Sequence, residues 1–124
     1  MKMNIKIKNK MGWILSILVS LALVASAADK IYLSDHAREI SGLVGISPGA
    51  YRTLGTIEIL SVLLFLFPRT GVLGFLLLSS YLGGAIATHL QHGQPVWFPA
   101  LFECILWIGS VFRFPELMLR ISHR

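Results

Sequence analysis

Charged residues are so sparse in this chain that they leave four long apolar runs, and this spacing limits the folds open to it. Charged residues make up 14% of the 124 residues, whereas soluble domains carry about 25%. A helix of about 20 apolar residues is long enough to cross a bilayer. The sequence therefore predicts a single all-α domain, a four-helix transmembrane bundle, with spans at about 11–28, 51–67, 71–90 and 97–112.

The first apolar run has two interpretations. Four lysines within residues 1–10, an apolar stretch and Ala-Ser-Ala at 25–27 resemble a cleavable signal peptide. The same run carries small residues on one face, which is typical of a helix packed against others. We expect a retained first helix on this account. The small residues are Gly12, Ser16, Ser20 and Ala27.

The polar segments between and after the runs contain signals for two further short helices. Ser34 is placed to cap a helix that ends near Gly42, and Pro48 marks the turn before the second span. Pro115 is placed to begin a final helix. We expect both short helices to lie at the membrane surface.

Lysine and arginine placement predicts the topology. Cytoplasmic loops of membrane proteins carry the excess of these residues. With four spans both termini share one side, and eight basic residues fall there against three opposite, so both termini are predicted to be cytoplasmic. A net charge of +5 does not indicate nucleic-acid binding, because the charges sit at span ends. The larger group is Lys2, Lys6, Lys8, Lys10, Arg69, Arg113, Arg120 and Arg124, and the smaller is Lys30, Arg38 and Arg52.

The third run carries a stripe of small residues at helical spacing. Helices in lipid associate by close contact, which small residues permit, so this stripe is predicted to pack against another helix. The alternative is a glycine pair that merely kinks the helix. His89 falls on the opposite side of the helical wheel, at the helix end. The stripe consists of Ser80, Gly83, Gly84, Ala87 and Thr88.

Two glutamates lie inside predicted spans, Glu58 in the second and Glu103 in the fourth. A charged side chain at such depth costs at least about 2.5–3.5 kcal/mol, so it is protonated, paired or facing a polar cavity. Two carboxylates brought together in a bundle would leave at least one neutral near pH ~7. The functional interpretation is a proton-handling site or a site for a quinone head group. The alternative is hydrogen bonding that holds helices together.

Polar residues at the outer span ends form a second candidate group. Asp29, Lys30, Arg52 and His89 would surround a polar mouth above the glutamates. Lysine and arginine at span ends also reach for lipid head groups, which is the interpretation we favour for Lys30 and Arg52. His89 is equally suited to a ligand and to a bond with a helix-end carbonyl. No metal site is predicted, because the histidines lack carboxylate or cysteine neighbours at ligand spacing.

These motifs together resemble the DoxX-like family of small bacterial membrane proteins. The resemblance covers nearly the whole chain, and its most specific part is the third span. The motifs are Ala-Asp-Lys at 28–30, Leu-Val-Gly-Ile-Ser-Pro at 43–48, Leu-Gly-Thr-Ile-Glu-Ile-Leu at 54–60, Phe-Pro-Arg at 67–69, Tyr-Leu-Gly-Gly-Ala-Ile-Ala-Thr-His at 81–89 and Gly-Gln-Pro at 93–95.

The resemblance implies a four-helix bundle in the bacterial cytoplasmic membrane, with Glu58 and His89 at the family's polar positions. The wider family includes membrane subunits of a thiosulfate:quinone oxidoreductase. The expected function is therefore a redox- or quinone-associated membrane subunit, with a quinone as candidate cofactor. The alternative is a non-enzymatic chaperone, scaffold or small-solute carrier. Expected partners are the lipid bilayer and a membrane or redox protein, with a homo-oligomer also open; the sequence leaves open whether the chain is an enzyme.

Overall fold

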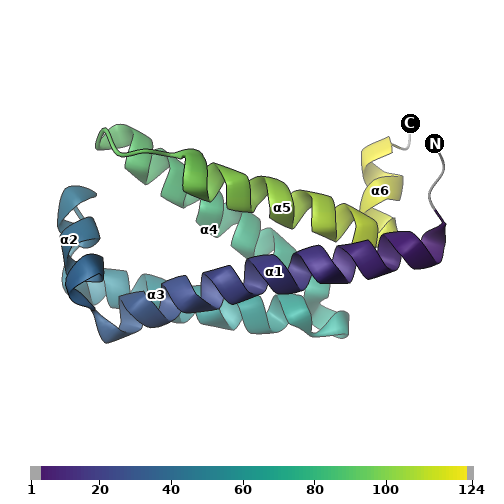
Figure 1. Cartoon of the computed structure of the whole chain (residues 1–124), viewed down its shortest axis with the longest axis horizontal. Helices are drawn as coiled ribbons and strands as arrows, with labels where there is room; N and C mark the ends of the chain where they lie inside the picture. The colour runs from purple at the N-terminus through teal and green to yellow at the C-terminus, as the bar shows by residue number, and fades with distance from the viewer. Residues whose placement is uncertain (1–3, 123–124) are drawn as a thin grey trace.

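The computed structural model describes residues 4–122 and folds them into a bundle of α-helices (Figure 1). The all-α prediction is confirmed, since no strand occurs in this range. The helices are α1 (Ile5–Tyr32), α2 (Asp35–Leu43), α3 (Pro48–Leu66), the 3₁₀ turn η1 (Pro68–Thr70), α4 (Gly71–Gln91), α5 (Trp97–Arg113) and α6 (Pro115–Ser122).

Three of these helices are individually long and apolar enough to cross a membrane. They are α1, α3 and the continuous segment of η1 with α4. The shorter α5 qualifies only when it is counted together with α6, from which it is separated by a bend of 101°. By length and composition the described chain therefore provides three spans, or four if that bent pair is one.

Local capping explains where the helices begin. The Ser34 hydroxyl accepts a hydrogen bond from the backbone nitrogen of Ala37, which starts α2 as predicted. Ser47 caps α3 in the same way, with Pro48 in the first helical position. The first helix is longer than the predicted 11–28, because Asn4 caps it and the lysine-rich segment continues the helix.

The four long helices form a ring of contacts in which α1 and α4 each pack against both α3 and α5. Both ends of the described chain lie at the same end of the bundle, which is tightly packed and which we call the packed end (Figure 1). A Cβ atom on Gly12 of α1 would lie 2.6 Å from the backbone of Arg113, so α1 and α5 nearly touch there. Phe65 and Phe75 are fully buried in the core beside this contact.

At the opposite end, which we call the open end, α4 and α5 diverge from α1 and α3 while α2 lies across (Figure 1). Gly74, near the packed end of α4, would place a Cβ atom 2.1 Å from the Phe65 backbone. Gly84, near the open end, would meet no atom of the described chain within 4 Å. Between Gly74 and Gly84, α4 therefore moves away from its neighbouring helix.

The small-residue stripe of α4 is not the packing spine that the sequence predicted. The helix buries its other face, through Gly71, Gly74, Phe75, Leu78 and Leu82. Within the described chain this face is mostly open, because a Cβ on Gly84 would meet no atom within 4 Å and one on Gly83 would meet only Oε2 of Glu103, at 3.9 Å. Ser80, Gly83, Gly84 and Ala87 are exposed and Thr88 is half-buried.

A charged cavity at the open end

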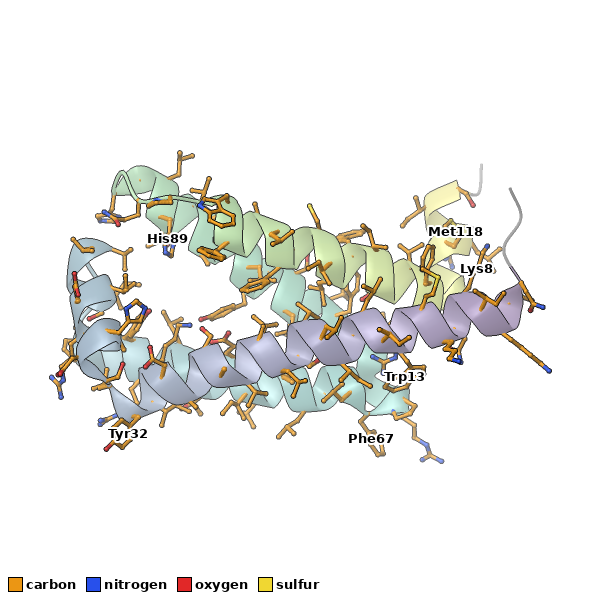
Figure 2. All side chains as sticks on the ribbon, in the orientation of Figure 1. Lys8, Trp13, Tyr32, Phe67, His89 and Met118 are labelled. Atoms are coloured by element: carbon orange, nitrogen blue, oxygen red, sulfur yellow. The ribbon has the colours of Figure 1, made fainter. Side chains whose placement is uncertain are left out.

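The divergence of the helices leaves a cavity of about 950 Å³ between α1, α3, α4 and α5, with α2 at its edge. Most of its wall is apolar and includes Leu23, Leu54 and Phe102. Figure 2 shows side chains from both helix pairs projecting into the space between them. A cavity of this size takes a small organic molecule or the head group of a larger one.

A lysine and a glutamate from different helices meet in this wall. The Lys30 ammonium of α1 lies 3.0 Å from Oε1 of Glu58 on α3, and it also donates to the Ser26 hydroxyl at 2.5 Å. The Glu58 side chain is 1% exposed and that of Lys30 is 12% exposed. The approach of α1 to α3 depends on Gly55, whose Cβ would lie 2.9 Å from the Ala27 carbonyl oxygen.

Two tyrosines complete the surroundings of the pair. The Tyr81 hydroxyl donates to Oε1 of Glu58 at 3.0 Å, which links α4 to α3. The Lys30 ammonium lies 5.6 Å from the centroid of the Tyr81 ring and 5.5 Å from that of Tyr51. Aromatic faces attract a cation at such distances. The pair is thus held from three helices, and its geometry is fixed before any ligand arrives.

The pair nevertheless has unused hydrogen-bonding capacity. Oε2 of Glu58 is buried and has no hydrogen-bond partner among residues 4–122. An ammonium has three protons, and two of those on Lys30 are accounted for by Ser26 and Glu58. A buried acceptor without a donor costs about 1–3 kcal/mol. The site therefore favours a ligand group that donates to Glu58 and accepts from Lys30, which a hydroxyl can do.

Two histidines line the same cavity near its mouth, His89 from α4 and His36 from α2. Nδ1 of His89 lies 2.7 Å from the Ala85 carbonyl oxygen. Since a carbonyl only accepts, Nδ1 donates, which leaves Nε2 as the free atom of the ring. His89 thus makes the helix-end bond and also lines the cavity.

Glu103 does not join Glu58. It lies on α5 beside Ser79 and Trp107, is half-buried, and is not part of the cavity wall. The Trp107 indole donates to the Ser79 hydroxyl at 3.0 Å, which ties α5 to α4 at this position. The two glutamates therefore do not share a site, and Glu58 is paired with the ammonium of Lys30 instead.

Arg52, the other basic residue of the group expected at the mouth, does not line the cavity. Arg52 is exposed, and its Nε donates to the Ile31 carbonyl oxygen at 2.9 Å, which ties the start of α3 to the end of α1. Lys30, for which the sequence favoured a lipid head group, turns inward instead. The available signal was the charge of Lys30, which is opposite to that of Glu58 and stands at the span end nearest to the start of the second span.

A second buried cation at the packed end escaped the sequence analysis altogether. Arg113, which the sequence analysis counted only among the basic residues of the predicted cytoplasmic side, is 6% exposed. Its guanidinium carbon lies 3.8 Å from the Trp13 ring centroid and 4.6 Å from that of Phe114. Trp13 is one hundred positions from Arg113 in the chain, so spacing alone could not assign its ring to this cation.

Within residues 4–122 no group of three or more histidine, cysteine, aspartate or glutamate side chains is arranged to hold a metal ion. Cys104, the one cysteine of the chain, is exposed on α5. The cavity thus offers one ion pair, two phenol rings and two imidazoles within a largely apolar wall.

Comparison with known proteins gives one match. The model of the DoxX-like family matches residues 14–109, which include α1 from its third turn onward and most of α5. Searches of curated proteins and of solved structures found no significant match. The matched range contains every residue of the ion pair and of the cavity wall.

Proposed function

The chain belongs to the DoxX-like family of membrane proteins, and from this membership and the charged cavity we propose that it binds the head group of a quinone or quinol. It would do so as the membrane subunit of a redox assembly, in which a partner protein exchanges the electrons. The observation that carries the proposal is the buried Lys30–Glu58 pair in an otherwise apolar cavity.

The atoms left free by the pair match the two forms of such a head group. A quinol hydroxyl can donate a hydrogen bond to Oε2 of Glu58, and a quinone carbonyl can accept a hydrogen bond from the remaining N–H of Lys30. The rings of Tyr51 and Tyr81 supply apolar faces beside the same atoms. The role proposed for this chain is to bind and orient the head group and to exchange its proton through Glu58.

The setting proposed is the bacterial cytoplasmic membrane, with α1 retained, four spans and both termini on the cytoplasmic side. Retention of α1 is supported by its contacts with α3 and α5, which include the close approach to α5 at Gly12. Both described chain ends lie at the packed end (Figure 1), which agrees with an even number of spans. The lysine and arginine excess at that end supports its cytoplasmic position.

The experiment is mass spectrometry of small molecules that co-purify with the chain in mild detergent. Wild type should retain a quinone, and Glu58→Gln should lose it. Glutamine keeps the shape of the side chain and an acceptor for Lys30 and Tyr81, but it turns the free oxygen into a donor. Glu103→Gln is the matched control, because it alters a second span glutamate outside the cavity.

Three outcomes separate the candidate functions. A quinone held by wild type and Glu103→Gln but lost from Glu58→Gln, with equal yields of folded protein, supports the proposal. Equal losses of quinone and of folded protein contradict a binding role for Glu58. A wild-type preparation that carries a stoichiometric protein partner and no quinone supports the chaperone or scaffold alternative.

A further inference from the structure

The cavity opens sideways, between α3 and α4. Ser80 and Gly84 both line the cavity and are both exposed at the surface of the protein. Leu54 of α3 lines the same cavity. Because no described atom lies within 4 Å of a Cβ placed on Gly84, the space beside α4 is continuous with the outside.

This opening lies at the depth of the bilayer interior. Ser80 is nine residues into the 21-residue α4, or about 14 Å along a helix of about 30 Å. The exposed residues around it are apolar and include Leu76 and Leu77 on α4 and Ile57 and Leu60 on α3. A molecule that enters between these helices comes from the hydrocarbon region rather than from water.

We infer that this gap is a lateral portal, through which a ligand with a long apolar chain enters from the bilayer and in which its chain remains. The stripe residues Ser80 and Gly84 form the α4 edge of the portal. The independent observation that points to a ligand is Oε2 of Glu58, an unpartnered atom of a 1% exposed side chain in the same cavity. The identity of the head group rests on the proposed function, whereas the chain and its route rest on the portal.

Small residues at the portal have a direct physical role. A side chain at position 84 would project into the gap, where a chain of methylene or isoprene groups would otherwise lie. Because that chain comes from lipid, what it gains in the gap is close van der Waals contact rather than removal from water, and a filled gap denies it those contacts. The stripe thus keeps a path open at Gly84, which explains a small residue at a position where no atom of the described chain lies within 4 Å of a Cβ.

The test compares two ligands with the same quinone head group, one with a long prenyl chain and one without a chain, on protein in lipid nanodiscs. Gly84→Leu should weaken binding of the long-chain quinone at least about tenfold, because the leucine side chain occupies the space in which that chain makes its contacts. Binding of the short analogue should change by less than about twofold. Ala87→Leu is the control, since Ala87 is an exposed stripe residue that does not line the cavity.

Unchanged affinity of Gly84→Leu for the long-chain quinone overturns the portal, and so does an equal loss for both ligands. If wild type binds neither ligand, the proposed head group is wrong, and the portal is then tested without a quinone. For that purpose an apolar bimane fluorophore is attached to Ser80→Cys in a Cys104→Ser background. Lipids brominated in mid-chain should quench the fluorescence at position 80 as strongly as that of the same fluorophore on Leu76→Cys, an exposed apolar position of α4. The portal is overturned if aqueous iodide quenches the fluorophore at position 80 as strongly as it quenches one on His36→Cys of the surface helix α2.

Discussion

The two ends of α4 place the same residue type in opposite surroundings. A Cβ atom on Gly74 would lie 2.1 Å from the backbone nitrogen of Phe65, whereas one on Gly84 would meet no described atom within 4 Å. Glycine permits a helix contact at the packed end and keeps a space free at the open end. Small residues in a membrane helix therefore mark either a contact or an opening, and the neighbouring helix decides which.

The two buried cations differ in the same way. Arg113 at the packed end is enclosed by aromatic rings and donates to the Leu66 carbonyl oxygen at 3.4 Å. Lys30 at the open end faces a carboxylate whose second oxygen is unpartnered. Nη1 of Arg113 is also buried without a hydrogen-bond partner in the described chain, but it lies among aromatic rings, whereas the free oxygen of Glu58 belongs to a residue that lines a cavity. Four variants break or sharpen this comparison.

The largest effect is expected for Gly74→Leu. Overpacking costs about 1–3 kcal/mol when side chains can adjust, and here the obstacle is the backbone of α3, so we expect more than about 3 kcal/mol. Fluorescence-detected size-exclusion chromatography of membrane extracts should show little or no folded protein. Gly84→Leu, the same substitution ten positions on, should give a wild-type peak. Equal behaviour of the two variants would contradict the distinction between the packed and the open end.

The next largest effect is expected at the ion pair. Lys30→Met removes the only partner of Glu58 that carries a charge in the described chain, and an uncompensated buried charge costs about 3–5 kcal/mol. We expect a destabilisation near the lower end, about 3 kcal/mol, because Tyr81 still donates to Glu58. Thermal unfolding in detergent measures it. Adding Glu58→Gln to Lys30→Met should recover part of the lost free energy of unfolding. If the losses of the two single variants simply add in the double variant, the two residues act independently.

The fold was largely predictable from the sequence because its signals are local. The serine caps of α2 and α3, the proline at the start of α6 and the apolar runs each depend on a few neighbouring residues. The buried face of α3, which combines Gly55, Glu58 and Ser61, also follows from helical periodicity. These features need no information about which helix lies beside which.

The candidate site was predictable only in part, because it depends on helix neighbours. Glu58 was found because an acid inside a span is costly by itself. Its partner Lys30 was missed because a lysine at a span end usually reaches for head groups, and only the contact of α1 with α3 turns it inward. The stripe was misread for the same reason, since a helical wheel shows a face and does not show what covers it.

A smaller effect is expected for Arg113→Lys. A lysine keeps the charge but cannot lie flat against Trp13, and its ammonium is more strongly hydrated. We expect a loss of about 1–2 kcal/mol, the range of one or two cation–π contacts, in thermal unfolding. Arg120→Lys, on the exposed face of α6, is the control and should be neutral. Equal melting temperatures for the two variants would show that the aromatic enclosure contributes nothing beyond charge.

The smallest effect is expected for Ser34→Ala, which loosens α2 above the cavity. The Ser34 hydroxyl accepts from the Ala37 backbone and donates to the Asp29 carboxylate, so it connects the start of α2 to the end of α1. Loss of such a cap costs about 0.5–1 kcal/mol. Amide hydrogen exchange should become faster in α2, by about two- to fivefold, and stay unchanged in α1 and α5. Ser47→Ala is the control, because it removes the corresponding cap of α3 without loosening α2 above the cavity. Faster exchange throughout the bundle would mean that α2 is part of the packed core, and the division between a closed end and an open end would then fail.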